Sequence, residues 1–378
     1  MNEKWLIEQF KWLHRHPELG MQERATTAFL KDRLREAGVA LPETGLETGA
    51  IAVISGDPKG PVVGLRADID ALPIPEESGL EYASEHPGVM HACGHDFHAA
   101  CMLGAALLLK QREKELPGTV KVVFQPAEEI DDGARKVIAT GLLDDVQAFY
   151  AGHTYPWFEA GTLGIKPGPV MAAADRFAIR IRGKGAHAAH PDLSADVIPA
   201  MAAIIQSAQT VVSRNVNPFE SAVVSITRAQ AGNTWNIIPE EAELEGTART
   251  LNPAVRDAVQ ARLEAIAVST ARAHGCEAEF EYERGSSAVI NDAAACERAA
   301  ALAREMGFNV AQQMGTLGAE DFSEYLAMAP GAFIRVGTGG GCDAHHPRFT
   351  VDPTALYPAA RFFAALAERE LKRLRDGQ

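Results

Sequence analysis

Two patterns of hydrophobic residues alternate in the first part of the chain. Short apolar runs bounded by Gly and Pro, such as IAVIS (51–55) and TVKVVFQ (119–125), predict strands that are buried on both faces. Segments with apolar residues three or four positions apart predict helices between them. This alternation is typical of an α/β fold, a mainly parallel sheet with helices on both faces. The expected elements are helices at 3–15, 22–37, 97–111 and 133–141 and strands at 51–55, 61–70, 119–125 and 147–152.

The pattern changes near residue 172. The segment RFAIRIRG (176–183) alternates strictly between apolar and polar residues, as a strand with one face in water does. The elements that follow have the order β-α-β-β-α-β, which predicts a ferredoxin-like α+β unit. Its expected strands lie at 176–183, 221–227, 241–250 and 276–283, and its helices at 194–213 and 253–273.

The first pattern returns after residue 287. The expected elements there are helices at 291–306 and 354–375 and a strand at 332–337. A length of 378 residues suits two or three domains. We therefore predict a smaller domain (172–287) inserted into a larger α/β domain that consists of 1–171 and 288–378.

Composition narrows the possible functions. Hydrophobic residues make up 47% of the chain, which is typical of a folded protein with a sizeable core. Asp and Glu (50) outnumber Lys and Arg (36), and the net charge of −14 argues against nucleic acid or an anionic membrane as a partner. No apolar run approaches the roughly 18 residues of a membrane span, and the charged, amphipathic start does not resemble a signal peptide. We therefore expect a cytoplasmic protein.

The segment MHACGHDFHAA (90–100) holds the densest cluster of reactive side chains. Five of them lie within eight positions, just before a predicted helix: His91, Cys93, His95, Asp96 and His98. A thiolate and an imidazole are good ligands for zinc, nickel and similar divalent ions. The five cysteines of the chain are scattered and odd in number, so we expect free or metal-bound thiols. Alternatively, Cys93 is a nucleophile with a nearby histidine as its base.

Further metal ligands follow three predicted strands. Glu128 and Glu129 come after the strand that ends at Gln125, where open α/β sheets place ligands. Because neighbouring side chains point in different directions, one glutamate could bind metal and the other act as a general base. Two solvated glutamates that open a helix are the alternative. His153 ends another strand, and His345 lies in a loop after a third.

These segments together offer more ligands than one zinc ion needs. The set comprises Cys93, His95, Glu129, His153 and His345. Five ligands exceed one tetrahedral zinc site but suffice for two metals that share a bridging group.

Three residues of the inserted domain could contact a substrate. The glycines of GKGAHAAHP (183–191) allow a tight turn that presents His187. Asn236 and Arg249 could bind a carboxylate, the arginine through two parallel hydrogen bonds. A surface charge on an edge strand is the alternative for Arg249.

In all these motifs the chain resembles peptidase family M20, and within it the amidohydrolase branch, subfamily D. The matching segments span nearly the whole chain in the order of the family. They are LHRHPELGMQE (13–23), LRADIDALPI (65–74), MHACGHD (90–96), FQPAEE (124–129), GHTYP (152–156), GKGAHAAHP (183–191), NIIPEEAELEGTART (236–250), GAEDF (318–322) and HHPRF (345–349).

The resemblance implies an enzyme that hydrolyses the amide bond of N-acyl amino acids, such as N-acetyl or benzoyl derivatives, to a carboxylic acid and a free amino acid. It implies a catalytic α/β domain and an inserted lid domain that often mediates dimerisation, and hence a homodimer. Two divalent ions per chain, Mn, Zn, Ni or Co, would bind to the five ligands named above.

The resemblance also implies roles for the remaining candidates. Glu128 would be the general base, and His187 would be a lid histidine that stabilises the oxyanion, often across the dimer. Asn236 and Arg249 would hold the substrate. Asp70 matches an aspartate that orients a metal ligand in the wider family.

Three positions depart from the pattern of the family. Asp68 stands where relatives outside this branch have a histidine, and residues 130–132 replace a glycine run. His346 makes the register of the last ligand ambiguous, and the spacing to the proline of Pro-x-Phe favours His345. A dipeptidase of the same family, a cysteine hydrolase that uses Cys93, and a binding protein that keeps the fold are the alternative functions.

Overall fold

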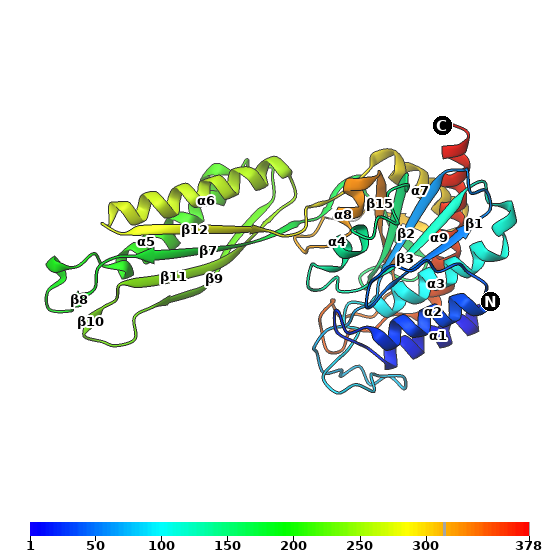
Figure 1. The fold of residues 1–378 in the computed structure, drawn as a ribbon, viewed down its shortest axis with the longest axis horizontal. Coiled ribbons are helices and arrows are strands. Elements are labelled where there is room, and N and C mark those ends of the chain that lie inside the picture. Colours follow the sequence, from blue (N-terminus) through cyan, green and yellow to red (C-terminus); the bar gives the residue numbers. More distant parts are fainter. Residues whose placement is uncertain (313–314, 378) are drawn as a thin grey trace. The chain divides into compact units, whose positions relative to one another are not determined.

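The computed structural model describes residues 1–312 and 315–377, which form two compact units (Figure 1). The first unit contains Met1–Gly168 and two later segments that begin at Ile290 and Asp321. The second unit contains Pro169–Val289 and the short segment Gly315–Glu320. A two-stranded sheet of β6 (Gly168–Met171) and β13 (Val289–Asn291) lies where the chain passes from one unit to the other.

A seven-stranded sheet forms the centre of the first unit. Four neighbouring strands at its middle are parallel: β3 (Thr119–Gln125), β2 (Val62–Asp68), β4 (Ala148–Tyr155) and β15 (Gly331–Gly337). Antiparallel strands flank them, β1 (Ala50–Ser55) beside β3 and β5 (Thr162–Gly164) beside β15. The sheet ends with β14 (Asn309–Ala311), which runs parallel to β5.

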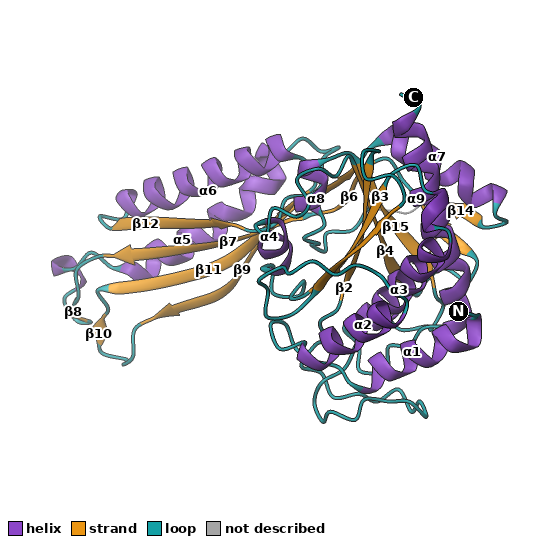
Figure 2. Cartoon of the chain, turned by 45° about the vertical axis from the view of Figure 1, so that its right-hand side comes forward, coloured by secondary structure: helices purple, strands orange, loops and turns teal. Residues whose placement is uncertain are grey.

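Helices cover both faces of this sheet, as the continuous apolar runs predict (Figures 1 and 2). Successive residues of β4 show this arrangement. Tyr150 is buried in the main core together with Phe363, whereas Phe149 faces the other way and its ring lies 5.3 Å from that of Tyr325. The helices are α1 (Glu3–Arg15), α2 (Arg24–Glu36), α3 (His95–Gln111), α4 (Gly133–Ile138), α7 (Ala293–Glu305), α8 (Ser323–Met328) and α9 (Leu356–Arg375).

The second unit is a four-stranded antiparallel sheet with α5 and α6 packed against each other (Figure 2). Its spatial strand order is β12-β7-β11-β9. Alternate residues of β11 are buried, as predicted for a sheet with one face in water. The chain order is β7 (Ala173–Arg182), α5 (Val197–Thr210), β9 (Ala222–Ala231), β11 (Glu241–Thr250), α6 (Pro253–Ala273) and β12 (Glu277–Arg284).

The predicted fold class is therefore confirmed, a mainly parallel α/β sheet with a separate antiparallel α+β unit. Among the described residues, no helix combines the length and the apolar composition that crossing a bilayer requires. A small pair of strands, β8 (Ala186–His187) and β10 (Ile237–Ile238), lies beyond one end of the four-stranded sheet (Figure 1).

Candidate metal centre

The predicted ligands lie where the central parallel strands end. β3 leads into Glu128 and Glu129, β4 carries His153 near its end, and the loop after β15 contains His345. Because these strands are parallel neighbours, their carboxyl ends meet at one edge of the sheet. The loop before α3, which follows β2 along the chain, adds Cys93, and the first residue of α3 is His95.

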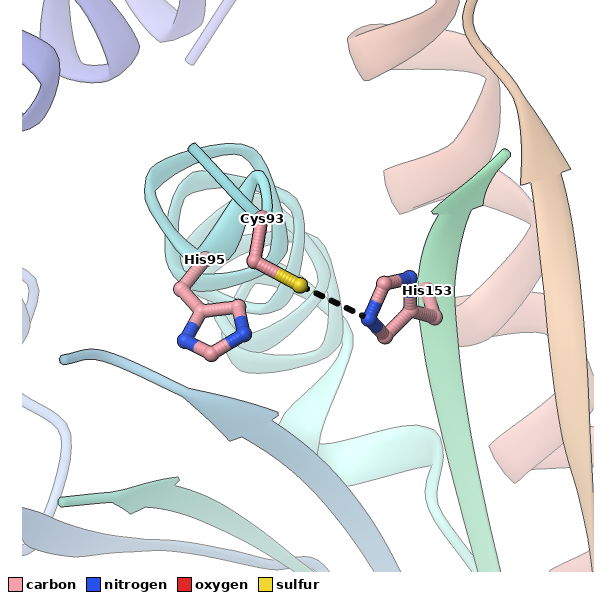
Figure 3. Close-up of side chains that lie close together, drawn as sticks. All are labelled: Cys93, His95 and His153. Atoms are coloured by element: carbon pink, nitrogen blue, oxygen red, sulfur yellow. Dashed lines mark hydrogen bonds between the residues drawn. The ribbon is translucent and has the colours of Figure 1, made fainter. Parts of the chain in front are cut away.

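All five predicted ligands converge at this edge. The possible ligand atoms of Cys93, His95 and His153 lie within 4.8 Å of one another, and so do those of Cys93, Glu129 and His345. The Sγ atom of Cys93 is 3.5 Å from Nε2 of His153 (Figure 3), and Nε2 of His345 is 3.3 Å from Oε1 of Glu129. All but His345, whose side chain is 54% exposed, are buried or nearly so.

Hydrogen bonds fix the tautomers of two of the histidines. Nδ1 of His153 lies 2.8 Å from the carbonyl oxygen of Thr154, which can only accept, so Nδ1 carries the proton. Nδ1 of His95 lies 3.3 Å from a carboxylate oxygen of Asp70 and donates in the same way. In its neutral form each ring therefore carries its lone pair on Nε2, which is the arrangement that metal-binding histidines need.

The surroundings of His95 Nε2 have the shape and charge of a cation site. This atom is buried and has no hydrogen-bond partner among the described residues. Carboxylate oxygens of Glu128 and Glu129 lie 3.9 and 3.8 Å away, which is too far for hydrogen bonds. A buried nitrogen lone pair that faces carboxylates across such a gap fits a divalent ion, and so does the donor set of sulfur, nitrogen and oxygen.

Hydrogen bonds to two carboxylates hold the turn that carries Glu128 and Glu129. Oδ1 of Asp70 accepts a hydrogen bond from the backbone N–H of Glu128 (3.1 Å), and Oδ2 accepts one from Glu129 (3.0 Å). Asp70 thus holds both glutamates and His95 in one arrangement. Oε1 of Glu23 accepts a hydrogen bond from Ala127 N–H (2.8 Å) in the same turn, where Ala127 has a positive φ of 54°.

The comparisons with known proteins identify the family. The profile of Peptidase family M20/M25/M40 matches residues 64–369. The chain belongs to this family. One relative, the N-acetylcysteine deacetylase of Bacillus subtilis (strain 168), is 46% identical over 363 residues, 96% of each chain. The N-acyl-L-amino acid amidohydrolase of Geobacillus stearothermophilus is 41% identical over 280 residues, 74% of this chain and 76% of that protein.

A solved structure extends the M20 comparison to three dimensions. The crystal structure of a Bacillus subtilis protein, described as a dinuclear metal binding peptidase from the M20 family, has a TM-score of 0.90 and 43% sequence identity. The similarity covers 98% of both chains. The family predicted from the sequence motifs is confirmed.

The donors of this M20 chain have perturbed proton affinities. Burial, helped by the nearby Glu129 carboxylate, raises the pKa of the Cys93 thiol to about 12. Burial also lowers the pKa of His153 well below its usual value, and His98 adds to this effect. Burial alone would lower the pKa of His95 too, but the carboxylate of Asp68 raises it well above its usual value. Bound metal competes with the protons of the Cys93 thiol and the His95 imidazole, so binding should release them.

The positions that depart from the family pattern have local explanations. Asp131 has a φ of 55°, so it takes a left-handed conformation that a glycine would adopt more easily. Nδ1 of His346 accepts a hydrogen bond from the backbone N–H of Arg348 (3.1 Å) within its own loop. His345, by contrast, extends toward Glu129.

The three predicted substrate-contacting residues of the second unit lie in two separate places. His187 and Asn236 are together, since the Asn236 carbonyl accepts a hydrogen bond from Ala188 N–H (3.1 Å) and β8 pairs with β10. Arg249 lies near the far end of β11, paired with Ala174 of β7. It is eight residues from the start of that strand, about 26 Å at 3.3 Å per residue. The structure does not bring Arg249 to His187 within this unit.

Sequence reasoning gave no role to several residues that support the centre. Glu23 lies in a matched segment near the start of the chain, and Asp321 in the segment GAEDF. Both are buried. Glu23 accepts a hydrogen bond from Ala127 N–H just after β3, and Asp321 accepts one from the side-chain amide of Gln125 at the end of β3. Their presence in the matched segments was the only signal that could have pointed to them.

Proposed function

We propose that this chain hydrolyses the amide bond of N-acyl amino acids to a carboxylic acid and a free amino acid. The observation that carries the proposal is the buried Nε2 of His95, which has no hydrogen-bond partner in the described part of the chain and faces carboxylates across a gap beside the other four donors. The relatives support the reaction class, because one is an N-acetylcysteine deacetylase and another is an N-acyl-L-amino acid amidohydrolase.

Two divalent ions would be held by Cys93, His95, Glu129, His153 and His345. When bound, such ions supply Lewis acidity, which makes a water molecule more acidic and polarises the scissile carbonyl. Manganese, zinc, nickel and cobalt all accept this set of sulfur, nitrogen and oxygen donors.

Glu128 is the general base of the proposal. Its Oε2 lies 3.9 Å from Nε2 of His95, at the edge of the same gap, while its backbone is fixed by Asp70. Glu128 takes a proton from the water as the water oxygen attacks the amide carbon. It then delivers that proton to the amine nitrogen as the carbon–nitrogen bond breaks.

His187 is suited to donate a hydrogen bond to a developing oxyanion. Its Nδ1 accepts a hydrogen bond from the backbone N–H of Ala189 (3.0 Å), so the ring proton lies on Nε2. The exposed Nε2–H is therefore a donor, as stabilisation of an oxyanion requires.

The distance between Arg249 and the pair His187–Asn236 within the second unit favours a homodimer. Arg249 lies about 26 Å along β11 from Glu241, and the pair His187–Asn236 lies beyond that end of the strand, so their separation exceeds the length of an N-acyl amino acid. If both groups act on one substrate molecule, two chains must supply them. Trp235 and Ile237 flank Asn236 and are 91% and 57% exposed, which is typical of a surface that a partner covers.

The deciding experiment combines a substrate panel with two neighbouring variants. Wild-type protein should hydrolyse acetyl-, benzoyl- or indoleacetyl-amino acids and lose this activity to a chelator. Glu128→Gln should keep its metal and lose about 10²–10⁴-fold in kcat, the usual contribution of a general base. Glu129→Gln, the matched control, should lose metal as well.

Three results would contradict the proposal. Full activity of Glu128→Gln would remove the general base. Faster cleavage of dipeptides than of every acyl amino acid would favour the dipeptidase of the same family. Activity that survives complete chelation would favour the cysteine hydrolase.

A further inference from the structure

A cluster of buried charged residues lies behind the proposed ligands. Arg66 and Asp68 are on β2, two residues apart and therefore on the same face of the strand. The guanidinium of Arg66 donates to Asp68 Oδ2 (2.6 Å), to Asp321 Oδ1 (2.6 Å) and to Gln125 Oε1 (2.9 Å). The side chains of Arg66, Asp68 and Asp321 are at most 2% exposed. The proposed mechanism assigns these residues no role.

His98 connects this cluster to the strand that carries His153. Its Nε2 accepts a hydrogen bond from the backbone N–H of Thr154 (2.8 Å). Because an amide N–H can only donate, the proton of His98 is on Nδ1, which donates to Asp68 Oδ1 at 2.5 Å. One ring thus joins the end of β2 to the end of β4.

The same ring lies between the two ligand-bearing segments. His98 is one helical turn after His95 on α3, and its ring centroid is 5.4 Å from that of His95 and 4.5 Å from that of His153. Thr154 adds a second link, because its Oγ1 donates to the carbonyl of Cys93 (2.9 Å). The end of β4 is therefore connected both to α3, through His98, and to the loop before α3, through Cys93.

These bonds also decide what Asp68 can do. A carboxylate oxygen of Asp68 and ring nitrogens of His95 and His98 lie within 4.8 Å of one another, close enough for the three residues to hold one ion. Both oxygens are nevertheless engaged, Oδ2 by Arg66 and Oδ1 by His98. A guanidinium at 2.6 Å would repel a cation bound to Oδ2, so this group of three is unsuited to metal binding.

We propose that Arg66, Asp68 and His98 are positioning residues that hold His95 and His153 at metal-binding separation, and that Asp68 is not itself a ligand. This inference rests on the proposed function, because it needs the metal centre to be real. The carboxylate of Asp68 is the anion that joins the guanidinium of Arg66 to the ring of His98.

The test measures cobalt binding rather than turnover. Co²⁺ is titrated into apo-protein, and the thiolate-to-cobalt absorption of Cys93 reports the occupied centre. His98→Gln keeps an acceptor for Thr154 N–H but loses the donor to Asp68, and His98→Asn does the reverse. Each should weaken cobalt binding by about 10- to 100-fold, the usual effect of losing a partner behind a ligand.

Asp68→Asn separates positioning from ligation. If Asp68 only positions, this variant should bind cobalt more weakly but still reach the wild-type stoichiometry and absorption spectrum at saturation. Loss of one ion at saturation would show that Asp68 is a ligand and would overturn the proposal.

The control is Asp175→Asn in the second unit. Asp175 is also buried and accepts hydrogen bonds from Arg256 and Tyr282, so its loss disturbs folding in a comparable way. The cobalt affinity of the Asp175→Asn protein should equal that of the wild-type protein. Wild-type affinity in both His98 variants would overturn this inference alone, whereas absence of cobalt binding in the wild-type protein would overturn the proposed function.

Discussion

The protonation of a single thiol separates two of the possible chemistries. A cysteine nucleophile must be a thiolate, and reactive cysteines have lowered pKa values. Burial and Glu129 instead raise the pKa of Cys93 to about 12, so the free thiol is protonated at neutral pH. A divalent cation would stabilise the thiolate directly, which makes Cys93 a suitable metal ligand and a poor unassisted nucleophile.

A pair of cysteine variants on one segment tests this assignment. Cys93→Ser should lower metal affinity by more than about 100-fold, since even the loss of a residue behind a ligand costs 10- to 100-fold. Cys101→Ser is the matched control, because Cys101 is equally buried on α3 but outside the ligand groups among the described residues. Metal content is measured after dialysis. Equal metal content in wild type and Cys93→Ser would contradict the assignment.

Residue type explains what could be predicted about the site. Cys93, His95 and His153 are chemically distinctive and could be selected from the amino-acid sequence alone. Glu23 and His98 could not be assigned roles, because their importance comes from partners 104 and 56 residues away in the chain. A hydrogen bond of that kind leaves no periodic pattern in the sequence.

At the scale of elements, one histidine joins α1 to the long loop 73–89. Nδ1 of His14 on α1 lies 2.6 Å from Asp96 Oδ2, and Nε2 lies 3.1 Å from Glu76 Oε1. Glu76 in turn accepts a hydrogen bond from Ser84 N–H (2.7 Å) and so closes the loop. Burial alone would lower the pKa of His14, but Asp96 and Glu76 raise it to about 9.

This raised pKa predicts a loss of stability in alkali. A histidine whose pKa is higher in the folded than in the unfolded state stabilises the folded protein. This stabilisation is fully present at pH values below the unfolded pKa of about 6.5, and it is lost as pH rises through the folded pKa. The free energy of unfolding should therefore fall by about 3 kcal/mol between pH 6.5 and 9.5 through His14.

The measurement compares variants of two histidines on α1 and just after it. Urea unfolding at several pH values should show that His14→Gln is less stable than wild type near neutrality and that the difference shrinks above pH 9. His16→Gln, the control, changes a partly exposed ring two residues away and should follow the wild-type profile. A constant difference between wild type and His14→Gln from pH 6 to 10 would contradict the prediction.

Element length explains which elements were predicted. The strand expected at 119–125 is observed as Thr119–Gln125, because an apolar run of this length indicates a buried strand. The helix expected at 253–273 is observed as Pro253–Ala273, because it is long enough to show its period. β5 and β14 have three residues each and were not predicted. Such short strands are defined by their neighbours in the sheet rather than by their own pattern.

At the scale of the molecule, the change of pattern near residue 172 reflects two separate cores. Phe124 and Leu103 belong to the core of the first unit, and Phe177 and Leu263 to that of the second. Periodicity reports which faces of an element are buried, so a sheet covered on both faces and a sheet covered on one face differ visibly in sequence. It carries no information on how many chains form a complete site.

Mixing two inactive variants tests whether two chains complete one active site. Arg249 and His187 lie at opposite ends of the same unit, so a homodimer could combine Arg249 of one chain with His187 of the other. His187→Ala and Arg249→Ala should each be nearly inactive alone. When the two variants are unfolded and refolded together in equal amounts, half of the dimers contain one chain of each variant. Half of the active sites in these mixed dimers are intact, so about one quarter of wild-type activity should return.

His187→Ala mixed with Asn236→Ala is the control, because both changes affect the same end of the unit and no active site becomes intact. Activity that stays at the level of the separate variants in the first mixture would show that each chain uses its own His187.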